Sequence, residues 1–288
     1  MIAVDPTNPS GIVWLASFPR SGNTWTRVFL TNLRRIVDGD VRDLELNRLD
    51  DQFSILDVSS HLYREALGRP PLSATPAEIA AIRPRVLRSI VERANGLVLL
   101  KTHNANAVVY GVRFIPPELS AGAIYVVRNP LDVAISSADF RRISIDKAIA
   151  EIGSSGFSAD TTSNQVYSLF GSWSENVATW TAVDDPALLV VRYEDMAARP
   201  IETFGRIADH ILLKRTPEQL AEAIEQSSFD RLRGLEEKSG FRERPEGVDH
   251  FFRVGKPGQW REILTAAQVD RVVNDHREQM TRFGYLPQ

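Results

Sequence analysis

Cysteine is absent from the 288-residue chain. Its absence excludes disulfide bonds, metal sites built on thiolates and a cysteine nucleophile. A chain without cysteine also fits a reducing compartment, which favours a cytoplasmic location.

An excess of basic residues is also lacking. The chain has 34 Lys and Arg against 37 Asp and Glu, for a net charge of -3. Because proteins that bind nucleic acid usually carry a basic surface, no nucleic-acid partner is predicted. Any anion site has to be local, made of a few basic side chains and backbone N–H groups.

Long hydrophobic runs are missing as well. No stretch approaches the roughly 18 apolar residues that a helix needs to cross a bilayer. The first residues, MIAVDPTNPSG, lack the basic start and apolar stretch of a signal peptide. The sequence therefore predicts a soluble cytoplasmic protein with no membrane span.

Four short apolar runs stand out among the residues that are present. They are continuous rather than alternating, which is typical of strands covered on both faces of a parallel sheet. Patterns with helical spacing lie between them, among them one that begins at Trp25 and one that the Ser172–Glu175 pair would cap. This alternation predicts an α/β fold with a central, mostly parallel sheet flanked by helices. The runs are 12–16, 97–100, 123–127 and 188–191.

Insertions interrupt this alternation, yet no linker or repeat divides the chain. We expect one domain over 1–288, with insertions at about 39–94, 140–165 and 238–250 that shape an acceptor pocket. In the first insertion, prolines at 70, 71, 76 and 84 are expected to break up the helices. Small polar residues predict a mobile loop over 152–164, and charged residues with Gly and Pro predict another over 238–258.

The first candidate site follows the first strand. Residues 17–25, SFPRSGNTW, lead from the strand into a helix, so backbone N–H groups and the helix dipole face one point. Gly22 permits close approach of a ligand, and Arg20 supplies a full charge. The loop therefore predicts a site for a phosphate-like anion. The nucleotide-triphosphate signature G-x-x-x-x-G-K-[ST] is absent, and an ordinary capped turn is the alternative.

Two further strand ends carry candidate residues. Lys101-Thr102-His103 ends the second strand, where ligands of open parallel sheets bind, and His is the side chain suited to act as a base near neutral pH. Arg128 ends the third strand. Asn129 would cap the next helix, Pro130 would open it, and Ser136 would lie two turns in. The alternatives are a structural histidine, a structural ion pair for Arg128 with Asp132, and a packing role for Ser136.

These three segments together resemble the sulfotransferases that use 3′-phosphoadenosine 5′-phosphosulfate (PAPS). FPRSGNTW is similar to the family's 5′-phosphosulfate loop, Lys-Thr-His to its catalytic segment, and Arg-Asn-Pro-x-Asp-x-x-x-Ser to its 3′-phosphate segment. The resemblance implies a P-loop-like three-layer fold and sulfuryl transfer from PAPS to a hydroxyl of a small-molecule acceptor. No metal is implied. Within this family, the sequence looks most similar to bacterial enzymes that sulfate natural products.

The resemblance also implies roles for individual residues. His103 would be the general base, and Lys101 and Arg20 would stabilise the transferred group. Arg20 stands where the family has Lys, and a guanidinium is not equivalent to an ammonium in kind. Tyr-Glu-Asp, Ser-Ser-Phe and Arg-Val-Gly segments extend the resemblance toward the C-terminus. The residues implied to bind the nucleotide are Arg20, Ser21, Gly22, Asn23, Thr24, Trp25, Arg128, Ser136, Tyr193, Ser227, Phe229, Arg253, Val254 and Gly255.

Two other functions stay open at this stage. One is an ATP-dependent kinase of P-loop type, and the other is a nucleotide-binding module without catalysis. The acceptor cannot be identified from the sequence, although Asn104, which follows the Lys-Thr-His segment, is expected to affect its choice. The segment from Arg261 to Ala266, with Asp270 beyond it, resembles a short dimer segment of the family's cytosolic branch, and this resemblance implies a homodimer. The aromatic side chains that could line the acceptor pocket are those of Phe53, His61, Tyr63, Phe140, Phe157 and Phe241.

Overall fold

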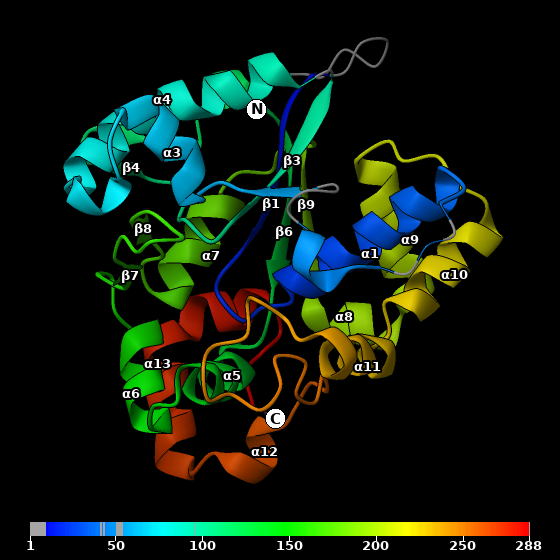
Figure 1. The fold of residues 1–288 in the computed structure, drawn as a ribbon. Helices are drawn as coiled ribbons and strands as arrows, with labels where there is room; N and C mark the ends of the chain where they lie inside the picture. Colours follow the sequence, from blue (N-terminus) through cyan, green and yellow to red (C-terminus); the bar gives the residue numbers. More distant parts are fainter. Residues whose placement is uncertain (1–9, 41, 43, 50–53, 95, 288) are drawn as a thin grey trace. The chain divides into compact units, whose positions relative to one another are not determined.

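A five-stranded sheet with the strand order β2-β3-β1-β6-β9 lies at the centre of the fold (Figure 1). The computed structural model describes residues 10–40, 42, 44–49, 54–94 and 96–287. The strands of this sheet are β1 (Gly11–Ser17), β2 (Ser54–Leu56), β3 (Leu97–Thr102), β6 (Ser120–Val127) and β9 (Leu188–Arg192). β1 runs parallel to β3, in a register from Gly11 opposite Leu97 to Ala16 opposite Thr102. Every residue of β1 and of β6 is buried, which explains their continuous apolar sequences.

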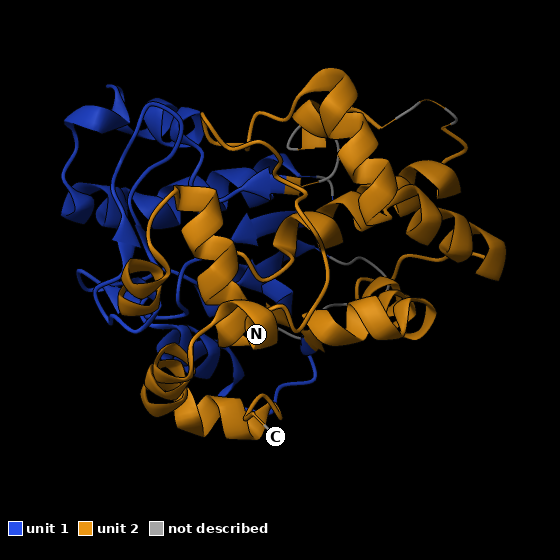
Figure 2. Cartoon of the chain, turned by 90° about the horizontal axis from the view of Figure 1, so that it is seen from below, with its two compact units in different colours: residues 1–19, 55–125, 151–190 blue, residues 20–54, 126–150, 191–288 orange. Residues whose placement is uncertain are grey.

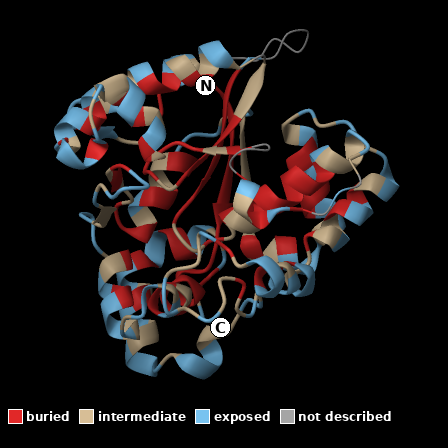
Figure 3. Ribbon diagram, viewed as in Figure 1, coloured by how far each residue is buried: buried red, intermediate tan, exposed pale blue. Residues whose placement is uncertain are grey.

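The α/β fold with a mostly parallel sheet is thereby confirmed, as are the four predicted strands. β2 was missed because a strand of three residues leaves no periodicity to detect. Figure 3 shows that burial is concentrated on the strands and on the helix faces turned toward them.

Helices and 3₁₀ turns connect the strands. Four of the helices, α4, α7, α10 and α13, begin with a capping box, and the Ser172–Glu175 box of α7 confirms the predicted one. The helices are α1 (Asn23–Val37), α3 (Ser60–Leu67), α4 (Pro76–Arg93), α5 (Pro130–Arg141), α6 (Ile145–Ile152), α7 (Trp173–Thr181), α8 (Tyr193–Ala198), α9 (Pro200–His210), α10 (Pro217–Gln226), α11 (Phe229–Ser239), α12 (Trp260–Ile263) and α13 (Ala266–Arg282). The 3₁₀ turns are η1 (Leu46–Arg48), η2 (Pro71–Ser73) and η3 (Pro117–Leu119).

The expectation that prolines fragment the first insertion is wrong for α4. Pro84 lies inside this 18-residue helix, while Pro76 opens it at a position where a missing N–H costs nothing. A proline in a helix interior removes one hydrogen bond and costs about 3 kcal/mol. Burial of an apolar face, including Ile79, Leu87 and Ile90, offsets that cost.

Short antiparallel ladders lie outside the main sheet. β4 (Val108–Val109) pairs with β5 (Val112–Arg113), and β7 (Ser158–Ala159) pairs with β8 (Ser168–Leu169). The predicted loop over 152–164 therefore contains a strand that the small polar composition did not indicate. The loop over 238–258 is confirmed, since no helix or strand occurs between Ser239 and Trp260.

The chain forms two compact units, coloured separately in Figure 2. Unit 1 comprises residues up to 19, 55–125 and 151–190, and it holds most of the main sheet. Unit 2 comprises 20–54, 126–150 and 191–288. The single domain over 1–288 stays a prediction. No helix within the described ranges is both long enough and apolar enough to cross a membrane.

Candidate active site

Two arginines and a serine from separate segments of unit 2 meet at hydrogen-bond distance. Nε of Arg20 lies 3.1 Å from the hydroxyl oxygen of Ser136, which α5 carries in its second turn. A guanidinium N–H of Arg128, from the end of β6, donates to the backbone carbonyl of Arg20 at 3.0 Å. Asn129 caps α5 through its side chain, as predicted. The structure thus brings together the residues assigned to the first and third motifs.

The two cations of this cluster, Arg20 and Arg128, repel each other. Burial, followed by repulsion from Arg128, lowers the pKa of Arg20 to about 10. Arg20 stays charged at neutral pH, and its guanidinium lies over the rings of Phe140 and Phe251, 4.2 and 4.8 Å from their centroids. Phe140, considered above for the acceptor pocket, therefore contacts Arg20. Two neighbouring cations at a half-buried position favour an anion between or beside them.

The loop that enters α1 is shaped to admit a ligand closely. Arg20 and Gly22 both have positive φ, 66° and 103°. The hydroxyl of Ser21 is buried and has no hydrogen-bond partner among the described residues. A Cβ at Gly22 would lie 2.6 Å from the ring of Tyr193, so that ring covers the glycine. A buried hydroxyl without a partner is costly, which fits a donor reserved for a ligand.

Aromatic side chains form a wall beside this loop. The indole of Trp25 makes edge contacts with Tyr193, Phe204 and Phe229 at centroid distances of 5.3–5.6 Å. Its N–H donates to the carbonyl oxygen of Ser227 at 2.8 Å. The hydroxyl of Ser227 is fully buried, where it donates to Ala223 and accepts from Asn32. Its predicted hydrogen bond to a nucleotide stays a prediction, although its only proton is already used here.

The Arg-Val-Gly segment packs against the same aromatic side chains. Gly255 has a φ of +70°, and a Cβ there would lie 2.5 Å from the ring of Phe229. The carbonyl of Gly255 accepts the hydroxyl of Tyr193 at 2.8 Å. Arg253 pairs with Asp139 at 3.2 Å, while Val254 is 40% exposed. Within unit 2, Gly255 therefore lies beside Tyr193 and Phe229.

Three acidic residues that the motifs did not assign to the site hold its segments in place. Asp132, in the first turn of α5, accepts the backbone N–H groups of Gly258 and Trp260. Glu194 accepts the backbone N–H of Asn129 and the hydroxyl of Tyr285, and burial raises its pKa. Glu243 pairs with the buried Arg27 at 2.7 Å. Partners more than 60 residues apart leave no local sequence signal, so these contacts could not be predicted.

Thr24 and Asn23 complete the predicted loop. The hydroxyl of Thr24 lies 3.5 Å from the carboxylate of Glu243, and Asn23 is buried as the first residue of α1. All fourteen residues implied to bind the nucleotide thus belong to unit 2.

Replacing Gly22 by alanine should impair both folding and nucleotide binding. The new methyl group would meet Tyr193 in a left-handed backbone, at a cost of about 2 kcal/mol. Urea unfolding measures the stability, and titration with 3′,5′-diphosphoadenosine measures binding. Gly39→Ala is the matched control, because Gly39 also has positive φ but no atom within 4 Å of the added Cβ. Equal effects of the two substitutions would contradict the role given to the Tyr193 contact.

Unit 1 contains the second motif at the end of β3. Lys101 is the last-but-one residue of the strand and is 8% exposed, and His103 follows the strand. Nδ1 of His103 lies 2.8 Å from the backbone carbonyl of Ser17. The hydroxyl of Ser17 lies 3.3 Å from the same nitrogen and can donate or accept. The carbonyl can only accept, so its shorter contact favours the tautomer with a proton on Nδ1 and the lone pair of the neutral ring on Nε2. This is the tautomer that a base acting through Nε2 requires.

Aromatic rings of unit 1 lie near the imidazole. Phe170 makes an edge contact with His103 at a centroid distance of 6.4 Å, and Phe157 contacts Phe170 at 5.2 Å. Phe157 had been predicted near an acceptor, whereas Phe170 was missed. Tyr63 is wholly buried in a polar network, and Phe241 belongs to the apolar core of unit 2. Their place in an acceptor pocket stays a prediction. Phe53 lies outside the described residues.

Asn104 does not have the role expected of it. The side chain is fully buried and its polar atoms bind Asp57 and the backbone N–H of Leu169. The residue therefore cannot select an acceptor by contact.

Comparison with known proteins extends the likeness over nearly the whole chain. The chain is 24% identical over 281 residues to the flavonol 3-sulfotransferase of Flaveria bidentis, covering 90% of this chain and 78% of that one. It is 24% identical to sulfotransferase 1A1 of Canis lupus familiaris, covering 94% and 83%. Among solved structures, retinol dehydratase in a complex with retinol and PAP gives a TM-score of 0.64 at 18% identity, covering 94% and 82%.

The structural likeness supports the fold alone, because the identity is low. The family assignment comes from the sequence itself. The sulfotransferase domain family matches residues 11–284, from β1 to the end of α13. The chain therefore belongs to the sulfotransferase domain family.

Proposed function

We propose that the protein transfers a sulfuryl group from PAPS to a hydroxyl of a small-molecule acceptor. The observation that carries the proposal is the meeting of Arg20, Arg128 and Ser136 in unit 2. Two guanidinium groups and a hydroxyl, gathered from three segments of unit 2, fit a ligand with more than one phosphate group. The flavonol 3-sulfotransferase among the relatives acts, by its name, on such a hydroxyl acceptor.

The residues present fit the nucleotide. Ser21 offers a buried hydroxyl without a partner among the described residues, and Gly22 leaves the space that a side chain would fill. Arg20, Ser21, Gly22, Asn23 and Thr24 would hold the 5′-phosphosulfate. Arg128 and Ser136 would hold the 3′-phosphate, with help from Arg253, Val254 and Gly255. The adenine would lie against Trp25, Tyr193, Ser227 and Phe229.

The proposed reaction follows from the residues assigned to catalysis and from those assigned to nucleotide binding. The acceptor oxygen forms its bond to sulfur as the bond from sulfur to the 5′-phosphate oxygen breaks. Nε2 of His103 takes the proton of the acceptor hydroxyl. Lys101 and Arg20 stabilise the negative charge that develops on the transferred group and on the departing phosphate. As in phosphoryl transfer, positioning and electrostatics supply most of the acceleration.

Calorimetry separates this function from its rivals. We expect 3′,5′-diphosphoadenosine to bind without added metal and at least tenfold more tightly than ATP with Mg²⁺, since a tenfold ratio needs only about 1.4 kcal/mol. Incubation with PAPS and a hydroxyl library, followed by mass spectrometry, should show products heavier by one sulfuryl group. Tighter binding of ATP with Mg²⁺ would favour a kinase. Tight diphosphoadenosine binding with no sulfated product would favour a non-catalytic module.

Other expectations stay predictions. The acceptor class, a homodimer through the segment from Arg261 to Ala266, and a cytoplasmic location rest on the sequence alone. In the described part of the chain, no group of three or more His, Cys, Asp or Glu side chains could hold a metal ion.

A further inference from the structure

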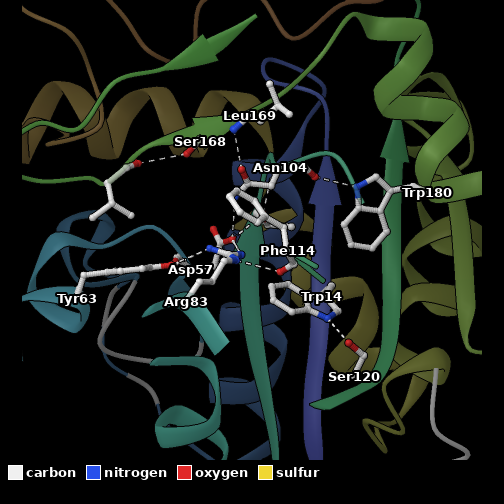
Figure 4. Close-up of polar contacts among 12 residues, drawn as sticks. Trp14, Asp57, Tyr63, Arg83, Asn104, Phe114, Ser120, Ser168, Leu169 and Trp180 are labelled. Atoms are coloured by element: carbon white, nitrogen blue, oxygen red, sulfur yellow. Dashed lines mark hydrogen bonds and ion pairs between the residues drawn. The ribbon is translucent and has the colours of Figure 1, made fainter. Parts of the chain in front are cut away.

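A buried carboxylate in unit 1 gathers donors from the segment that carries the proposed base. Oδ2 of Asp57 accepts the hydroxyl of Thr102 at 2.8 Å and the side-chain amide of Asn104 at 3.2 Å. The backbone N–H of Asp57 donates to the carbonyl of Lys101 at 3.1 Å. Asp57, Thr102 and Asn104 are all 0% exposed. One carboxylate thus binds the residues on both sides of His103. Figure 4 shows Asp57 beside Arg83 and Asn104.

A second buried charge holds Asp57 itself. The guanidinium of Arg83, from α4, pairs with Oδ2 of Asp57, donates to the hydroxyl of Tyr63 at 2.8 Å and donates to the carbonyl of Phe114 at 2.9 Å. Tyr63 in turn donates to the backbone carbonyl of Asp57 at 3.1 Å. Burial raises the pKa of Tyr63 to about 12, so its hydroxyl keeps its proton at neutral pH. Oδ1 of Asp57 is buried without a hydrogen-bond partner among the described residues, so these hydrogen bonds to the carboxylate all go to Oδ2. A buried network with this many hydrogen bonds restricts its members to few conformations.

Helix α7 and strand β8 secure the same segment from the other side. The amide of Asn176, which is fully buried, donates to the carbonyls of His103 at 3.1 Å and Phe170 at 2.8 Å. The indole N–H of Trp180 donates to the carbonyl of Asn104 at 3.0 Å. The side-chain oxygen of Asn104 accepts the backbone N–H of Leu169 at 2.9 Å. Each residue from 101 to 104 therefore has a hydrogen-bond partner that lies outside strand β3.

This arrangement differs from a contact made for stability alone. A buried ion pair adds little net stability, because desolvation of the two charges offsets their attraction. Its benefit is a single conformation. Here the groups that Asp57 fixes are those that set the backbone of His103, whose ring is also bonded to the carbonyl of Ser17.

We propose that Asp57 is a positioning residue, which fixes the segment from Lys101 to Asn104 through Thr102 and Asn104 and so orients Nε2 of His103 for proton transfer. The inference rests on the proposed function, since it assigns a purpose to the orientation of His103. Arg83 acts one step further out, by holding Asp57 in place.

The decisive variant is Thr102→Val, which removes the hydroxyl and keeps the shape of the side chain. Asp57→Asn would leave Arg83 buried without its countercharge and could prevent folding, so it is not the primary test. We expect kcat to fall about tenfold, because small misplacements of a reacting group cost rate rather than binding. KM for PAPS and affinity for 3′,5′-diphosphoadenosine should not change. Thr102→Ser, which restores a hydroxyl, should recover most of the rate.

Ser120→Ala is the matched control for lost stability. Ser120 is also buried in the main sheet, at the start of β6, and its hydroxyl accepts the indole N–H of Trp14 at 2.8 Å. We expect it to lower the midpoint of thermal unfolding as Thr102→Val does, with kcat unchanged. If Thr102→Val kept the wild-type kcat, or if Ser120→Ala reduced kcat equally, the inference would be wrong.

A double-mutant cycle and a spectrum separate this inference from the proposed function. Thr102→Val should have no further effect on residual turnover in a His103→Ala background, since it acts through His103. The ¹⁵N spectrum of the histidine side chains, with His103 identified by its loss in His103→Ala, should show a proton fixed on Nδ1 in the wild type. In Thr102→Val this signal should shift toward a tautomer mixture. A wild type that shows the fixed tautomer but makes no sulfated product would overturn the function. An unchanged spectrum in Thr102→Val would overturn the inference, whether or not product forms.

Discussion

Replacing His103 by alanine should lower kcat by a factor of 10² to 10⁴, roughly the contribution of a positioned general base. The physical reason is the ring's orientation, in which the carbonyl of Ser17 holds a proton on Nδ1 and leaves Nε2 to accept one. Without Nε2 of His103 as the base, the hydroxyl of the substrate must lose its proton to water. Steady-state turnover with PAPS and an accepted hydroxyl compound measures the loss.

Nucleotide binding should survive this substitution, because His103 is proposed to take the proton of the acceptor hydroxyl and is not among the residues proposed to hold the nucleotide. Titration with 3′,5′-diphosphoadenosine checks this. His210→Ala, at the end of α9, serves as the control and should keep full activity. Added imidazole should restore part of the lost rate in His103→Ala only. Turnover near the wild-type value would remove His103 from the catalytic role.

Arg128→Ala should strongly reduce discrimination between 3′,5′-diphosphoadenosine and AMP, which lacks the 3′-phosphate. A hydrogen bond to a charged group contributes about 1.5–3 kcal/mol, so the preference should fall roughly 10- to 100-fold. Arg128 is 7% exposed and its guanidinium lies over the ring of Tyr193 at 4.3 Å, which fixes the direction of its remaining N–H groups. Calorimetric titration with both nucleotides gives the ratio.

The ratio matters more than either affinity. Arg128 also donates to the carbonyl of Arg20, so its loss should loosen the 5′-phosphate loop and weaken both ligands together. Arg128→Lys, which keeps the charge without the planar fork, should retain part of the preference. Arg34→Ala removes an exposed arginine that pairs with Asp38 on α1 and should leave both affinities unchanged. Equal weakening of the two nucleotides by Arg128→Ala would place the 3′-phosphate elsewhere.

Local patterns predicted those parts of the molecule that depend on neighbours in sequence. The four apolar runs became strands β1, β3, β6 and β9, and Asn129 and Ser172 cap the helices expected of them. Residues Arg20, Arg128 and Ser136 also meet as the motif order implied. Parallel strands bring their carboxyl ends to one edge of a sheet, so strand-end motifs converge without any long-range information.

Contacts between distant segments were beyond the same reasoning. Asp57 follows a strand of three residues, and its partners Arg83, Thr102 and Asn104 lie 26 to 47 positions away. The position of Pro84 inside α4 was not predicted, for a related reason. Burial of the apolar face of α4 outweighs the cost of an internal proline only once the helix is packed.

The division of the chain between two units has a consequence for its synthesis. Unit 1 is complete once residue 190 has been made, but the stretches 20–54 and 126–150 must wait for residues beyond 190 to complete unit 2. These waiting stretches carry apolar side chains that end up fully buried, such as Phe29, Leu33 and Val133. Until the residues beyond 190 leave the ribosome, those side chains lack their native cover, and contacts of such large sequence separation form slowly. The nascent chain thus exposes apolar surface during an interval of its translation.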